Sequence, residues 1–127
     1  MLILDPIDGT KELVKLRPEC AYSLAIFNSS NIDDPKNISI VFNPFTGFEV
    51  STFTPLVEKK MFTKKHSTFV SRTEFESNLY EKYLNKDLEI NPMGSIAFKL
   101  SLLASHKCDF IVSLKPKNIW DLSLIHI

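Results

Sequence analysis

The stretch Asp5-Pro6-Ile7-Asp8-Gly9-Thr10 follows directly on a short apolar run, Leu2 to Leu4. An apolar run that ends abruptly at a polar turn is typical of a buried strand that delivers a loop at its C-terminal edge. Asp5 and Asp8 in this loop would repel each other unless a cation lies between them, and carboxylate oxygens are ligands that Mg²⁺ prefers. The alternative is a strand-ending turn in which both aspartates only cap backbone groups.

The remaining positions of the loop add further groups for the same chemistry. The carbonyl of Ile7 could turn toward the cation, since Pro6 restricts the backbone before it. Gly9 and Thr10 place backbone N–H groups at an expected helix start, where partial positive charge favours a phosphate oxygen. The loop therefore predicts adjoining metal and phosphate sites.

Composition excludes several classes of partner. The chain has 127 residues, enough for one domain, and its 15 Lys and Arg balance its 15 Asp and Glu. A neutral chain lacks the basic field that binding to a nucleic acid polymer or a membrane surface needs. Cys20 and Cys108 stand in apolar runs without metal or redox spacing, so we expect buried, reduced thiols. With no export signal and no membrane span in the sequence, we expect a cytoplasmic protein.

Strand signals separated by turns follow the loop. We expect strands over 20–27, 38–42, 48–53, 68–71 and 109–113. A polar loop over 28–37 and a turn from Asn43 to Gly47 would join the first three strands into antiparallel hairpins. The basic segment 59–66 is interpreted as a solvated edge strand or loop.

Two helices are expected in the second half of the chain. Thr73 and Glu76 have the spacing of a capping box that opens the first helix. Its apolar stripe would be Phe75, Leu79 and Tyr83, and its solvent-facing side Glu74, Glu81 and Lys82. The second helix, 95–105, is apolar nearly all round and should be buried between layers. The sequence thus predicts an α/β to α+β layered sandwich with a mixed, partly antiparallel sheet and two packed helices.

The six-residue loop resembles the metal and phosphate loop of the inositol monophosphatase family of magnesium-dependent phosphatases. The resemblance continues through the expected strands at 22–27 and 38–44, the Gly94-Ser95 turn and the motif Asn118-Ile119-Trp120-Asp121. It implies metal ligands at Asp5, Ile7, Asp8 and Asp121, phosphate contacts at Gly9 and Thr10, and catalytic roles for Asp8 and Thr10, with Thr10 orienting the attacking water.

The branch of the family is less sharply indicated. Lys11-Glu12, Ser71-Arg72 and Asn118-Ile119 resemble the 3'(2'),5'-bisphosphate nucleotidases. Those enzymes usually continue with Ser-His after Ser-Arg, whereas this chain has Thr73-Glu74, so nucleotide specificity stays open. Phe45-Thr46-Gly47 instead resembles a turn of the sugar- or histidinol-phosphate branches. The substrate contacts that the resemblance suggests are Lys11, Gly94, Ser95, Lys115 and Lys117.

The function implied is a Mg²⁺-dependent phosphomonoesterase that hydrolyses a small phosphorylated metabolite, with a bisphosphate nucleotide as one candidate. Two or more Mg²⁺ ions would bind in the full-length protein and lower the pKa of a bound water. The resemblance also allows a homodimer of the full-length protein. The alternatives are an inositol or histidinol monophosphatase and, from another class, a non-catalytic phosphate-binding fragment or module.

The ends of the chain carry expectations of their own. Residues 1–121 resemble an incomplete phosphatase domain without the N-terminal metal-ligand segment and the C-terminal portion of the family. We interpret 122–127 as translated sequencing adapter, because Leu-Ser-Leu-Ile-His-Ile is what the start of a common transposon-derived adapter encodes. A polypeptide that lacks one carboxylate ligand should bind Mg²⁺ more weakly and turn over little substrate alone.

Overall fold

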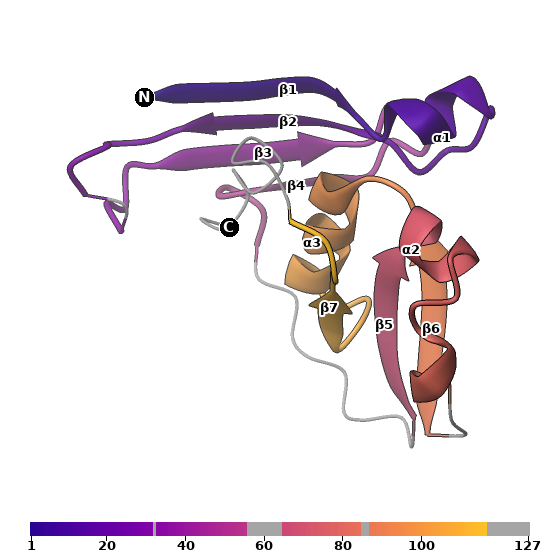
Figure 1. Cartoon of the computed structure of the whole chain (residues 1–127). Coiled ribbons are helices and arrows are strands. Elements are labelled where there is room, and N and C mark those ends of the chain that lie inside the picture. Colours follow the sequence, from indigo (N-terminus) through magenta and orange to yellow (C-terminus); the bar gives the residue numbers. More distant parts are fainter. Residues whose placement is uncertain (32, 56–64, 85–86, 117–127) are drawn as a thin grey trace.

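The computed structural model describes residues 1–31, 33–55, 65–84 and 87–116 of the chain. In this part a four-stranded sheet with the order β1-β2-β3-β4 lies beside a three-stranded sheet with the order β6-β5-β7. Figure 1 shows helix α3 between the two sheets. The layered class expected from the sequence is confirmed, with the antiparallel and parallel pairings divided between separate sheets.

The four-stranded sheet consists of hairpin-like antiparallel pairs. Its strands are β1 (Leu2–Asp8), β2 (Ala21–Ile26), β3 (Ile38–Phe42) and β4 (Glu49–Ser51). The predicted pairing of β2 with β3 is confirmed, with Leu24 opposite Ile40. The turn before β4 closes where the Gly47 N–H donates to the Asn43 carbonyl over 2.9 Å. Gly47 has a φ of 71°, a conformation that glycine adopts at little cost.

The two faces of this sheet differ in burial. Ala21 and Val41 are fully buried and pack with Ala97 and Phe98 of α3. Leu2 and Leu4, by contrast, are 62% and 56% exposed. The expectation that the first strand is buried was therefore wrong. Because side chains alternate along a strand, those of β1 that face away from α3 point to the outer surface of the sheet.

The three-stranded sheet is parallel and contains one strand that the sequence did not predict. It consists of β5 (His66–Ser71), β6 (Leu88–Met93) and β7 (Phe110–Val112). The strand β6 was missed because it contains Pro92, which cannot donate a ladder hydrogen bond. Among the described strands, β6 lies at an edge, which is where a sheet tolerates proline.

The first expected helix is broken into short pieces. Helix α2 covers only Arg72–Glu76 and is followed by a 3-10 turn, η1 (Glu81–Tyr83). The predicted capping box was wrong, since Ser71 precedes the helix and makes no side-chain cap. The helix cannot continue because Asn78 has a φ of 59°, in the left-handed region.

The break rearranges the side chains that had been assigned to two faces of one helix. Leu79 and Tyr83 are 39% and 44% exposed, whereas Tyr80 is only 3% exposed. Glu74, expected on the solvent side, is 1% exposed, and that expectation was wrong. Its carboxylate accepts hydrogen bonds from Tyr80, Ser113 and the Leu114 N–H, which replace the water it has lost.

Helices α1 (Thr10–Val14) and α3 (Ile96–Ala104) begin where the sequence indicates. Helix α3 is capped by Ser95 and is buried, as expected, against strands of both sheets. Its Lys99 is 2% exposed, an unusual burial for an ammonium group. Cys20 and Cys108 are buried free thiols, as expected.

Several expectations fall outside the described residues. These are residues 59–64 of the strand or loop expected over 59–66, the motif Asn118 to Asp121 with its metal ligand, Lys117, and the interpretation of 122–127. Within the described residues, none of the helices is both long and apolar enough to cross a membrane.

Candidate active site

The metal and phosphate loop begins with a bulge in β1. Asp5 pairs with Ser23 and Asp8 with Ala21, so Pro6 and Ile7 together stand opposite a single residue of β2. The sequence had suggested a strand that ends at Leu4. In the structure the strand instead continues through the loop to Asp8. The bulge is closed locally, because the Ile7 N–H donates to Oδ1 of Asp5 over 3.1 Å.

Gly9 turns the chain from β1 into α1. It has a φ of 92°, and its carbonyl accepts the first hydrogen bonds of the helix from the N–H groups of Glu12 and Leu13. A Cβ at Gly9 would lie 2.8 Å from the carbonyl oxygen of Glu19. Thr10 begins α1, and its hydroxyl donates to the Ile7 carbonyl over 3.3 Å. This turn requires glycine for both its conformation and its space.

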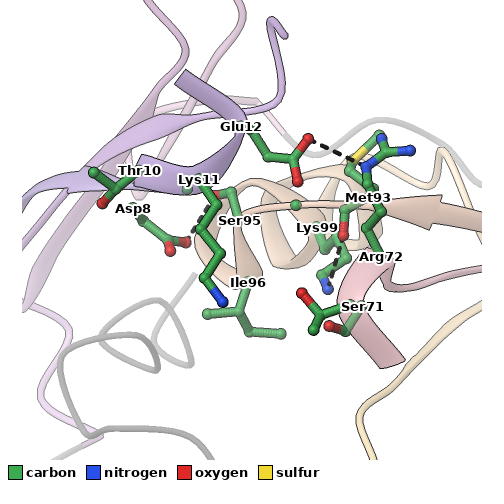
Figure 2. Close-up of a pocket in the computed structure, with 13 residues that line it drawn as sticks. Asp8, Thr10, Lys11, Glu12, Ser71, Arg72, Met93, Ser95, Ile96 and Lys99 are labelled. Atoms are coloured by element: carbon green, nitrogen blue, oxygen red, sulfur yellow. Dashed lines mark hydrogen bonds and ion pairs between the residues drawn. The ribbon is translucent and has the colours of Figure 1, made fainter. Parts of the chain in front are cut away.

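Asp8 is bound to the start of α3, far along the chain. Its Oδ2 accepts hydrogen bonds from the Ser95 hydroxyl and from the Ala97 N–H, each over 2.7 Å. The Ser95 oxygen in turn accepts from the Phe98 N–H over 3.0 Å. Figure 2 shows Asp8 and Ser95 meeting beside the cavity. The loop is thus tied to the buried helix by a charge-assisted hydrogen-bond pair.

A cavity of about 360 Å³ opens beside this junction. It lies where β1, α1, α2 and α3 meet (Figure 2). Of the residues predicted from the sequence, the cavity wall contains Asp8, Gly9, Thr10, Lys11, Gly94 and Ser95, but not Asp5, Ile7 or Lys115. Residues that sequence reasoning did not assign to the site are Glu12, Ser71, Arg72, Thr73, Met93, Ile96 and Lys99.

Carboxylates hold the guanidinium on the cavity wall. Arg72 donates from Nε to Oε2 of Glu12 over 3.1 Å and from Nη2 to Oε1 of Glu19 over 2.8 Å. Arg17 donates to the same Glu12 oxygen over 3.2 Å. Arg72 is therefore largely neutralised by its neighbours and contributes less positive charge to the cavity than its position suggests.

Two lysines supply positive charge to the cavity. Lys11 extends from α1 and Lys99 from α3 (Figure 2). Lys99 donates to the Met93 carbonyl over 3.4 Å. A lysine inside an otherwise apolar helix pattern was the sequence signal that could have identified this residue.

Solved structures resemble this arrangement over nearly the whole chain. The Thermotoga maritima IMPase matches with a TM-score of 0.74 and 22% identity, over 96% of this chain and 50% of that one. Mycobacterium tuberculosis SuhB gives 0.68 and 17%, over 96% and 56%, and SaIMPase-II with inositol monophosphate gives 0.69 and 17%, over 98% and 52%. The chain has the inositol monophosphatase fold. It spans about half the length of these structures. No family model and no curated protein matches it.

Within this inositol monophosphatase fold, the metal ligands that the sequence predicts among the described residues are all oxygens. Asp5, Asp8 and the Ile7 carbonyl are the kind of ligands that suit a hard cation such as Mg²⁺. The described residues contain no group of three or more His, Cys, Asp or Glu side chains that could hold a metal. Asp8 alone of these three residues lies on the cavity wall, so the described residues supply one carboxylate of a Mg²⁺ coordination shell there.

The neighbouring thiol does not extend this donor set. Burial, together with the charge of Asp8, raises the pKa of Cys20. The thiol is then neutral at physiological pH, whereas metal binding by cysteine requires the thiolate. Cys20 therefore adds no ligand to the oxygens of the loop.

Proposed function

We propose that this chain carries the metal and phosphate loop of a Mg²⁺-dependent phosphomonoesterase acting on a small phosphorylated metabolite. The observation that carries the proposal is that Asp8, Thr10 and Lys11 of the loop line one cavity together with Lys99. A carboxylate for a cation and ammonium groups for a phosphate are thereby brought to the same space. The inositol monophosphatase fold supports the same proposed function.

Residues of the loop and of the cavity would have distinct parts in binding a phosphate ester. Asp5 and Asp8, with the Ile7 carbonyl, would hold Mg²⁺, which when bound supplies charge neutralisation and a more acidic water. The Thr10 hydroxyl lies at the start of α1, where it donates to the Ile7 carbonyl, and would orient that water. Lys11 and Lys99 would offset the charge of the phosphate oxygens.

For the substrate, we propose a 3'(2'),5'-bisphosphate nucleotide, with inositol or histidinol phosphate as alternatives. SaIMPase-II structures contain inositol monophosphate and 2'AMP, which makes both ligand classes candidates here. The ammonium groups of Lys11 and Lys99 favour a substrate with more than one anionic group. Glu74, at the position of the nucleotidase histidine, is buried away from the cavity wall and cannot replace that imidazole.

A non-catalytic phosphate-binding module is the second candidate. It is favoured by the incomplete donor set, since the described residues hold no group of three metal-binding side chains. We also propose that the 127-residue polypeptide alone binds Mg²⁺ weakly and turns over little substrate, because it spans about half the length of the structures that it resembles.

Calorimetry with Mg²⁺ and with inorganic phosphate tests the proposal. The wild-type chain should bind both, with phosphate bound more tightly when Mg²⁺ is present. Asp8→Asn should lower the Mg²⁺ affinity at least tenfold, because it removes a charged ligand. Asp33→Asn makes the same change at an exposed residue of the loop between β2 and β3, and it should bind both ligands like the wild type.

The outcome decides between the two candidates. Phosphate binding that is indifferent to both Mg²⁺ and Asp8→Asn would favour the non-catalytic module. A panel of 3'-phosphoadenosine 5'-phosphate, inositol phosphates and histidinol phosphate, assayed for phosphate release with Mg²⁺, would then separate the substrates.

A further inference from the structure

We propose that Ser95 is a positioning residue that fixes the Asp8 carboxylate for its cation, and that it does not contact substrate as the sequence had suggested. This inference rests on the proposed function. Ser95 lies at the N-cap of α3, and its hydroxyl donates to Oδ2 of Asp8 over 2.7 Å. The two residues are 87 positions apart in the chain, so the contact joins separate parts of the fold.

The hydroxyl of Ser95 is already engaged both as a hydrogen-bond donor and as an acceptor. A serine hydroxyl has one proton to donate, and here it goes to Asp8. The oxygen also accepts from the Phe98 N–H over 3.0 Å, which caps the helix. A substrate oxygen that needed a donor would therefore have to displace Asp8 from Ser95.

The carboxylate is held by two donors on one oxygen. Besides Ser95, the Ala97 N–H donates to the same Oδ2 over 2.7 Å. Two short bonds from one rigid helix start fix the plane and the rotamer of the Asp8 side chain. Groups that orient a metal ligand in this way typically change metal affinity 10- to 100-fold when they are removed, by analogy with other metalloproteins.

The backbone at Ser95 is shaped to make this contact. Ser95 has a φ of 52°, unfavourable for a residue with a Cβ, and is 7% exposed. A Cβ at Gly9 would lie 3.1 Å from the Cβ of Ser95 and one at Gly94 would lie 2.0 Å from Cγ of Glu12. The turn is thus pressed against α1 and the loop, and its strain is maintained by packing at the site where Asp8 is held.

Removal of the hydroxyl tests the proposal on the 127-residue chain. Ser95→Ala should raise the Mg²⁺ dissociation constant, measured by calorimetry, about tenfold. Ser95→Asn should stay within about threefold of the wild type, because an asparagine tolerates the left-handed backbone and offers both a donor and an acceptor. Ser105→Ala removes a hydroxyl from the opposite end of α3 and should leave Mg²⁺ affinity unchanged.

Two further measurements separate positioning from other roles. Circular dichroism in EDTA should show that Ser95→Ala remains folded at the temperature of the titration. If it does not, Ser95→Gly carries the test, because glycine also lacks the hydroxyl but adopts the φ of 52° without strain. Inorganic phosphate binding without Mg²⁺ should be the same for Ser95→Ala and the wild type. A weaker phosphate affinity with an unchanged Mg²⁺ affinity would assign Ser95 to the substrate and overturn the inference.

The inference and the proposed function fail in different ways. A wild-type chain that binds no Mg²⁺ would overturn the proposed function and the inference with it. If the wild-type chain binds Mg²⁺ and Ser95→Ala binds it with the same dissociation constant, the inference alone is overturned.

Discussion

Nε of Arg72 lies 3.1 Å from Oε2 of Glu12, a contact that joins helix α2 to helix α1 across one wall of the cavity. The same guanidinium binds Glu19, whose Oε2 is buried without a hydrogen-bond partner in the part of the chain that the structure describes. Both carboxylates are therefore held at the site by one planar donor. Lysine could not replace it, because an ammonium group lacks the fork that reaches two carboxylates.

Arg72→Ala should destabilise the protein by about 3 kcal/mol, because it leaves the largely buried Glu19 carboxylate without its cation and leaves Glu12 with Arg17 alone. Urea unfolding followed by circular dichroism measures the change. Arg17→Ala is the matched control, since Arg17 binds the same Glu12 oxygen but is more exposed, and it should cost less than about 1 kcal/mol. Equal losses of stability from both substitutions would show that the Arg72 contact between α1 and α2 contributes no more than the exposed Arg17 ion pair.

Gly94→Ala should cost about 3 kcal/mol, because the new Cβ would lie 2.0 Å from Cγ of Glu12. Glu12 could move aside only by breaking its contact with Arg72. Gly47→Ala provides the comparison, since nothing lies within 4 Å of its Cβ position and only its φ of 71° opposes the change. That substitution should cost about 1 to 2 kcal/mol in the same unfolding experiment. A Gly94→Ala protein as stable as Gly47→Ala would contradict the crowding at the cavity.

The parts of the fold that sequence predicted are those whose pattern is local. Strands β2 and β3 and helix α3 show apolar runs bounded by turn or cap residues, and each was expected within a few residues of its bounds. The strand β6 has no such pattern, because its Pro92 and polar residues are tolerated only by its place at a sheet edge. A single sequence does not show which strand will lie at an edge.

The candidate site was predicted where the residues resemble a known loop and missed where burial depends on distant partners. Asp8, Thr10 and Ser95 do meet at one cavity. Glu74 was expected on the solvent-facing side of a helix and Lys99 was given no role, yet both are almost fully buried. Glu74 is bound by Ser113 and Leu114, 39 and 40 residues later, and no local spacing could indicate that pairing.

Tyr80→Phe should destabilise the protein by about 2 kcal/mol, because the Tyr80 hydroxyl donates to the buried Glu74 carboxylate over 2.5 Å. Burial and the hydrogen bond to Glu74 raise the pKa of Tyr80 above its usual range, so this hydroxyl keeps its proton at alkaline pH values where an exposed tyrosine loses it. Tyr83→Phe makes the same change on a side chain that is 44% exposed and should alter stability by less than about 0.5 kcal/mol. If thermal unfolding gave the two variants the same midpoint, the Glu74 network would not contribute as described.

Cys108 should make the stability of the fold fall with rising pH in the alkaline range. Burial, followed by the charge of Asp109, raises the pKa of this thiol from 9.0 to about 11. The unfolded chain therefore loses the Cys108 proton first, near pH 9, while the folded chain keeps it until about pH 11. Between these values the folded state binds more protons, so the unfolding free energy falls as pH rises, by at most about 1.4 kcal/mol per pH unit for one thiol.

Urea unfolding at a series of pH values from 8 to 10 measures this slope. The contribution of Cys108 is fully present below pH 9 and is lost toward pH 11, so Cys108→Ala should show a shallower decline than the wild type. Cys20→Ala is the comparison, since the pKa of Cys20 is also raised by burial and by Asp8, and any flattening there reports on the loop beside the cavity. Parallel curves for Cys108→Ala and the wild type would mean that Cys108 ionises as readily in the folded chain as in the unfolded one, against its burial behind β7.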